Sequence, residues 1–136
     1  MSSAPVTVLL TGLTAAYVAR HDSNWDPEKL QKLLDESLVR LNEAPDLKAD
    51  VCWIDADHDS IEEKFQSTFR DGTGKHGRAY DGALIGWGLR CDASLTVIFQ
   101  DMVNAVRKTS PSTTLIFNGG QHDHLEAIQR TFPQLK

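Results

Sequence analysis

Side chains that could bind or activate a small molecule gather in two stretches of the sequence. The first is a long loop predicted at residues 11–25, which opens with Thr11 and Gly12 and also carries Tyr17 and His21. A phenol and an imidazole can both pass a proton to a substrate. Tyr17 and His21 are therefore candidate proton-transfer groups, while Thr11 and the backbone near Gly12 are candidate hydrogen-bond donors. The alternative is a plain surface excursion with Tyr17 packed onto the core.

The second stretch, residues 86–90, reads Gly-Trp-Gly-Leu-Arg. Gly86 and Gly88 would let the backbone approach a ligand closely, Trp87 would supply an apolar wall, and Arg90 adds a fixed cation. A helix predicted to follow at once would add unpaired N–H groups with partial positive charge. This combination favours a carboxylate or a phosphate. Alternatively, the glycines serve a tight turn and Arg90 pairs with a carboxylate.

Two further residues belong to the predicted site. Cys91 follows Arg90 at the predicted helix start, where a thiolate would be stabilised, so it is a candidate nucleophile. The sequence identifies no base to activate it. Asn118 comes after the last predicted strand and could reach a ligand beside the third strand.

Some acidic and histidine residues resemble dispersed metal ligands. His122 and His124 follow the last predicted strand, and residues 55–59 follow the second. In the strand order predicted below, these loops lie at opposite edges of the sheet, on the order of 14 Å apart. The sequence therefore predicts no metal site, and helix capping explains residues 57–60.

Nucleotide-binding patterns are incomplete in this chain. Residues 86–91 lack the third glycine of the dinucleotide fingerprint, and residues 72–75 precede a strand where a phosphate loop must follow one. Residues 11–14 are similar to the phosphate loop of flavodoxins, but the next predicted helix starts only at Asp26. We therefore predict no cofactor, with FMN binding as a third hypothesis behind the two given below.

The elements that must position these residues alternate between short apolar runs and stretches with apolar residues every three or four positions. A helix that starts at Asp26-Pro27 and stops before Pro45 presents a row of leucines. The other predicted elements are strands at 6–10, 51–54, 83–85 and 113–117, helices at about 60–69, from 92 to beyond 106 and about 122–131, and a mobile glycine-rich loop at 71–78.

Strand–helix units with short connections predict a parallel sheet with helices on both faces. The simplest strand order is 2-1-3-4, which gives a three-layer α/β/α sandwich of truncated flavodoxin-like or Rossmann-like type. Ligands bind such sheets beyond the carboxyl ends of the strands, where the winding direction reverses. Here that point lies between the first and third strands, where residues 11–25 and 86–90 would face each other.

Composition limits the possible functions. The 136 residues fit one domain, and a net charge of −5 argues against nucleic acid as a partner. Two cysteines are too few for a disulfide framework, which favours a reducing compartment. No apolar run is long enough for a membrane span, and the first residues lack a secretory signal pattern, so we expect a cytoplasmic protein.

The C-terminal half carries two motifs, Ile85-Gly-x-Gly-Leu-Arg90 and the helical run Val103-Asn-Ala-Val106. In both it resembles a group of short single-domain α/β proteins of microbial genomes. That group often has prolines directly after the arginine, where this chain has Cys91 and Asp92, and the difference weakens the case for Cys91. The resemblance implies a compact single-domain fold and no particular activity.

The sequence thus leads to two main hypotheses. The first is a small, metal-independent enzyme or ligand-binding protein that acts on a small anionic metabolite at the switch point. The second is a non-catalytic interaction module or a subunit of a homo-oligomer, in which Trp25 and Trp87 pack against a partner chain.

Overall fold

Four parallel strands form one sheet in the order β2-β1-β3-β4, as predicted. We used a computed structural model, which describes residues 4–120 and 122–135. The strands are β1 (Val6–Leu13), β2 (Leu47–Ile54), β3 (Gly82–Ile85) and β4 (Thr114–Phe117). The helices are α1 (Ala15–His21), α2 (Pro27–Glu43), α3 (Ile61–His76), α4 (Thr96–Thr109) and α5 (His124–Thr131), with 3₁₀ turns at Trp87–Leu89 and Ala93–Leu95.

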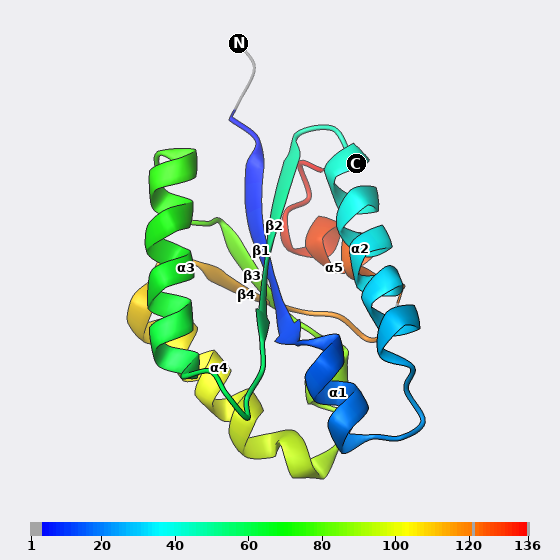
Figure 1. The fold of residues 1–136 in the computed structure, drawn as a ribbon. Coiled ribbons are helices and arrows are strands. Elements are labelled where there is room, and N and C mark those ends of the chain that lie inside the picture. The colour runs from blue at the N-terminus through cyan, green and yellow to red at the C-terminus, as the bar shows by residue number, and fades with distance from the viewer. Residues whose placement is uncertain (1–3, 121, 136) are drawn as a thin grey trace.

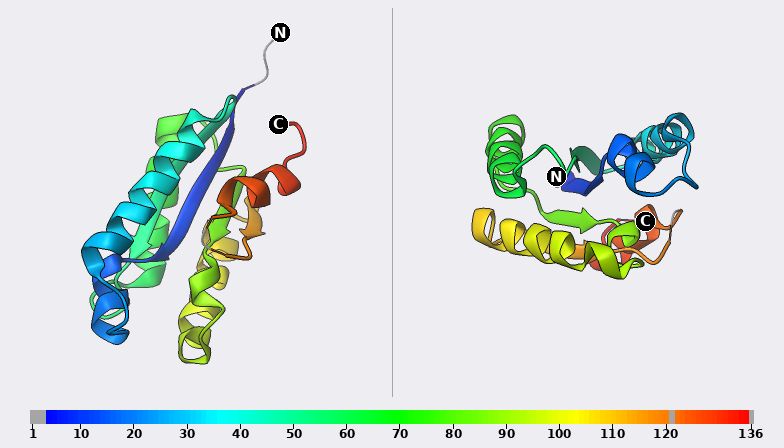
Figure 2. Two further views of the ribbon diagram at one scale, coloured as in Figure 1. Left: turned by 90° about the vertical axis from the view of Figure 1, so that its right-hand side faces the viewer. Right: turned by 60° about the horizontal axis from the view of Figure 1, so that its bottom comes forward.

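Helices cover both faces of the sheet, which gives the predicted three-layer α/β/α arrangement (Figure 1). Helices α3 and α4 lie on one face, and α2 and α5 lie on the other (Figure 2). Alternate residues of β1 separate the two cores: Leu9 packs toward α3 and α4, whereas Val8 and Leu10 pack toward α2 and α5. The strands all point the same way, so their carboxyl ends share one edge of the sheet.

The prediction that residues 11–25 form a loop is wrong for most of that stretch. Strand β1 continues to Leu13, and α1 follows directly. The side chain of Thr14 accepts a hydrogen bond from the backbone N–H of Tyr17 at 3.1 Å, which caps the first turn of α1. Only residues 22–26 connect α1 to α2.

The prediction of a mobile loop at residues 71–78 is also wrong. Helix α3 continues through this stretch to His76 and ends at Gly77, whose φ of 76° is a left-handed conformation that suits glycine. Inside the helix, Gly72 is buried against the ring of Tyr80. Its lack of a side chain therefore makes room for that ring.

Other boundaries shift by a few residues. Strand β2 begins at Leu47 rather than Val51. The helix predicted from Asp92 is preceded by a 3₁₀ turn, because the Asp92 carboxylate accepts the backbone N–H of Ser94 at 2.9 Å, and α4 starts at Thr96. Helix α5 starts at His124 rather than His122.

Candidate functional site

A cavity of about 580 Å³ opens at the carboxyl ends of β1 and β3. Helices α1 and α2 line one side of the cavity. The other side is lined by residues between 86 and 95 and by Asn118, Gly120, His122, His124 and Leu125. Figure 2 shows the helices of the first side facing the segment after β3. Pockets for small organic ligands commonly have volumes of about 300 to 1,000 Å³. The cavity is therefore large enough for a ligand and lies at the switch point of the sheet.

Nine of the ten residues predicted for the site line this one cavity. They are Thr11, Gly12, Tyr17, His21, Gly86, Trp87, Gly88, Cys91 and Asn118. The first four come from β1 and α1, and the other five come from the segments after β3 and β4. The structure thus brings together three stretches of chain that are far apart in the sequence, residues 11–21, residues 86–91 and Asn118.

Apolar side chains make up much of the wall. Leucines of α2, among them Leu30 and Leu34, face the cavity. All three tryptophans of the chain, Trp25, Trp53 and Trp87, line it as well. The sequence predicts the leucines of α2 only as one face of a helix, and it gives no signal that Trp53, which lies inside a strand, belongs to the site. An apolar body would replace water on these walls favourably.

Thr11 and Asn118 hold the floor of the cavity together rather than offering free polar groups. The Thr11 hydroxyl donates to the Leu84 carbonyl at 3.0 Å. The Asn118 side chain accepts the N–H of Trp87 at 2.8 Å and donates to the Gly120 carbonyl at 2.8 Å. These bonds fix the glycine turn beside β3, so the two residues shape the site.

Arg90 is the predicted site residue that the structure does not bring to the cavity. Its guanidinium donates to the backbone carbonyl of Asn118 and lies over the ring of Phe117, 5.3 Å from the ring centre. Phe117 packs with the core on the α3 and α4 face. The cation that suggested an anionic ligand is therefore engaged elsewhere.

A cluster of ionic contacts holds α1 beside the loop that follows β2. The guanidinium of Arg20 contacts Asp55 at 2.6 Å and Asp57 at 3.1 Å, and His21 Nε2 lies 2.8 Å from Asp57 Oδ2. The hydrogen bonds from Arg20 and His21 lower the pKa of Asp55 and Asp57, respectively, from the usual carboxyl value. Sequence spacing could not reveal this cluster, because its members lie about 35 residues apart.

Tyr17 projects from the same helix and stacks on the imidazole of His21, with ring centres 4.2 Å apart. It is only 6% exposed. Burial raises the pKa of Tyr17, and the nearby carboxylates of Asp57 and Asp55 raise it further. The phenol therefore stays protonated at neutral pH. Proton transfer by Tyr17 or His21 remains a prediction.

Cys91 lies on the opposite wall from α1. Its thiol donates to the Gly88 carbonyl at 3.3 Å, within its own turn. No hydrogen bond joins it to His21 among the residues that the structure describes. Its role as a nucleophile remains a prediction.

The histidines near α5 also reach the cavity wall. His122 and His124 both line it, and burial lowers the pKa of His124, so its ring is neutral at pH 7. Across residues 4–120 and 122–135, no three His, Cys, Asp or Glu side chains are arranged to hold a metal ion.

The stretch compared above with a flavodoxin phosphate loop has no loop in this structure. Residues 11–13 belong to β1, where Leu13 pairs with Ile54 of β2. The N–H of Thr14 donates to the Ile54 carbonyl at 2.9 Å, and its side chain caps α1. Helix α1 does follow at once, as in flavodoxins, but only Thr14 separates it from β1, so there is no loop that could surround a phosphate.

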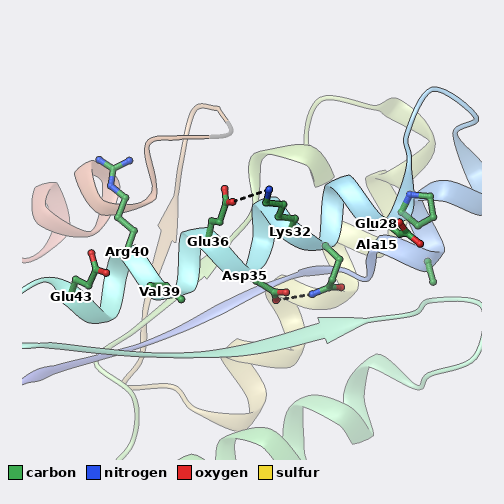
Figure 3. Close-up of a pocket in the computed structure, with 11 residues that line it drawn as sticks. Ala15, Glu28, Lys32, Asp35, Glu36, Val39, Arg40 and Glu43 are labelled. Atoms are coloured by element: carbon green, nitrogen blue, oxygen red, sulfur yellow. Dashed lines mark hydrogen bonds and ion pairs between the residues drawn. The ribbon is translucent and has the colours of Figure 1, made fainter.

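A second, shallow hollow lies along the outer face of α2 (Figure 3). Polar and charged side chains pair along it: Lys32 lies 4.0 Å from Glu36, and the amide of Gln31 donates to Asp35 at 2.9 Å. Such pairs four residues apart are typical of a solvated helix surface. We therefore regard this hollow as helix surface rather than as a binding site.

No family model, curated protein or solved structure matches the chain. We therefore infer its function from the geometry of the cavity. None of the helices within the described ranges combines the length and apolar character needed to cross a membrane.

Proposed function

We propose that this protein binds a small, mainly apolar organic molecule in the cavity between α1–α2 and the segments after β3 and β4. The observation that carries the proposal is the wall itself: a cavity of about 580 Å³ lined by all three tryptophans and by leucines of α2. Aromatic and aliphatic walls with a few polar groups are typical of small-molecule sites.

Charge supports an apolar rather than an anionic ligand. The expectation of an anion depended on Arg90, which does not line the cavity. Of the side chains that do, Asp22, Glu36 and Asp92 are acidic, whereas Arg40 lies 3.6 Å from Glu126. An anion would meet more carboxylates than free cations on these walls.

The position of the tryptophans also favours a ligand site over an interaction module. A module that packs against a partner through Trp25 and Trp87 needs both on an outer patch. Both are instead half-buried along the cavity. We therefore put forward small-molecule binding as the function.

The probe N-phenyl-1-naphthylamine tests this proposal, because it is uncharged and fluoresces strongly only in apolar surroundings. We expect saturable binding to the folded protein, with energy transfer from the tryptophans. Ser37 lines the cavity from α2, so Ser37→Phe fills part of it and should weaken binding by on the order of tenfold.

Lys32→Phe is the matched control for this experiment. Lys32 lies on the same helix but on its outer face, with 77% of its side chain exposed. The Lys32→Phe variant should bind the probe as the unaltered protein does. Circular dichroism checks that both variants fold. Equal loss in the two variants, or no saturable binding to the unaltered protein, would refute the proposal.

A further inference from the structure

The hydroxyl of Tyr17 is a polar group without a partner on the cavity wall. Only 6% of the Tyr17 surface is exposed. Its hydroxyl makes no hydrogen bond to residues 4–120 or 122–135, and Tyr17 lines the cavity. Within those ranges, no side-chain nitrogen or oxygen is sealed from solvent without a partner. The Tyr17 hydroxyl therefore retains access to solvent. Tyr17 is also one of the residues that line the cavity.

The ring that carries this hydroxyl is held in place before any ligand arrives. Thr14 caps the helix through the Tyr17 N–H, and the imidazole of His21 stacks on the ring. His21 is in turn held by Asp57 at 2.8 Å. A donor that is already fixed loses little conformational freedom on binding, so a hydrogen bond to it contributes more of its free energy to affinity.

The surrounding charges indicate which kind of acceptor this donor suits. The pKa of the Tyr17 hydroxyl is raised by the nearby carboxylates of Asp57, Asp55 and Asp92, which keep it protonated. The charge of Arg20 acts in the opposite direction. Arg20 is itself paired with Asp55 and Asp57. A carboxylate or phosphate placed here would be repelled, whereas a neutral oxygen would accept the hydrogen bond without that cost.

We propose that the Tyr17 hydroxyl is the polar anchor of the site and donates a hydrogen bond to an uncharged carbonyl oxygen of an otherwise apolar ligand. This inference rests on the proposed binding function. It adds the ligand class: a neutral ketone, ester or amide on a ring or chain that packs against the tryptophans. Asp57 acts as a positioning residue through His21.

The experiment compares three fluorescent probes that share an aromatic body. Prodan is uncharged and carries a ketone, N-phenyl-1-naphthylamine is uncharged without a carbonyl, and 8-anilinonaphthalene-1-sulfonate is an anion. Each is titrated against the unaltered protein and against Tyr17→Phe, which removes only the hydroxyl. The emission maximum of prodan also reports whether its carbonyl accepts a hydrogen bond.

We expect Tyr17→Phe to weaken prodan binding by about tenfold, the effect of one hydrogen bond, and to shift its bound emission to shorter wavelength. Binding of N-phenyl-1-naphthylamine, which has no carbonyl oxygen, should change much less than binding of prodan, and circular dichroism shows that the variant folds. The sulfonate should bind more weakly than either uncharged probe.

Two results would overturn the anchor and leave the cavity proposal standing. One is prodan binding that does not respond to Tyr17→Phe while N-phenyl-1-naphthylamine binds normally. The other is tighter binding of the sulfonate than of the uncharged probes. Failure of N-phenyl-1-naphthylamine to bind the unaltered protein would instead remove the proposed function, and the anchor with it.

Discussion

Gly72→Ala is expected to lower the free energy of unfolding by about 3 kcal/mol. A Cβ atom at Gly72 would lie 2.5 Å from Cζ and 2.6 Å from the hydroxyl oxygen of Tyr80. That ring has no room to retreat, because Tyr80 is 3% exposed, packs edge to face on Phe69, and donates to Asp50 at 2.7 Å. The new methyl group must therefore push apart α3 and the chain before β3.

Gly74→Ala, two residues along the same helix, is the control and should have the opposite sign. A Cβ atom there meets nothing within 4 Å, and the position is exposed. Replacing glycine by alanine inside an exposed helix stabilises it by about 0.5 to 1 kcal/mol. Urea denaturation of both variants measures the contrast. Similar effects from the two would mean that Tyr80 does not pack on Gly72.

The second large effect is expected at Asp50, which joins β2 to the end of α3. Its carboxylate accepts hydrogen bonds from Lys75 at 2.6 Å, His76 at 2.8 Å and Tyr80 at 2.7 Å. Burial alone would raise the pKa of Asp50, but these three hydrogen bonds outweigh it and lower the pKa to about 2. The folded state therefore favours the charged carboxylate.

The sign of the pH effect follows from that lowered pKa. The ordinary value is 3.8, so the carboxylate stabilises the fold fully above about pH 4 and loses this contribution as the pH falls through about 2. The contribution is about 2 kcal/mol. Asp50→Asn should thus be about 2 kcal/mol less stable than the unaltered protein at pH 7.

Urea denaturation at pH 7, 4 and 2 tests this expectation directly. The difference between Asp50→Asn and the unaltered protein should shrink between pH 4 and pH 2, because the Asp50 carboxyl becomes increasingly protonated as the pH approaches its lowered pKa. Asp22→Asn, on an exposed residue between α1 and α2, serves as the control. A difference for Asp50→Asn that stays constant across this range would show that its charge does not stabilise the fold.

Much of the fold could be predicted because it depends on local pattern and general rules of chain connection. The apolar runs at Val6–Leu10 and Val51–Ile54 can be read as strands, and right-handed crossovers then leave few strand orders. The sequence predicts an end of α3 near residue 69, because glycines such as Gly72 and Gly74 normally weaken a helix. The contact that favours Gly72 comes from Tyr80, and a sequence pattern does not show which ring will lie over which turn.

Helix α1 was missed for a different reason. Seven residues are too few for a helical period to stand out, and the cap at Thr14 precedes a run without an acidic residue in its first turn. The place of the cavity, in contrast, follows from the rule for parallel sheets, which predicts that residues 11–25 and 86–90 face each other.

The chemistry of the site was harder to predict than its place. The leucines of α2 give the same apolar stripe whether they pack on protein or border a cavity. The direction of Arg90 depends on the turn at Trp87–Leu89 and on Phe117 of β4, and spacing along the chain specifies neither. The pairing of His21 with Asp57 likewise exists only in three dimensions.

The central claim, a binding cavity walled by the three tryptophans, is tested most directly by nuclear magnetic resonance of their indole N–H groups. These groups give three signals that separate well from the backbone amides. On titration with N-phenyl-1-naphthylamine, we predict that the signals of Trp25, Trp53 and Trp87 all move and saturate with one dissociation constant. Indole signals that stay fixed while amides of α3 and α4 respond would contradict it.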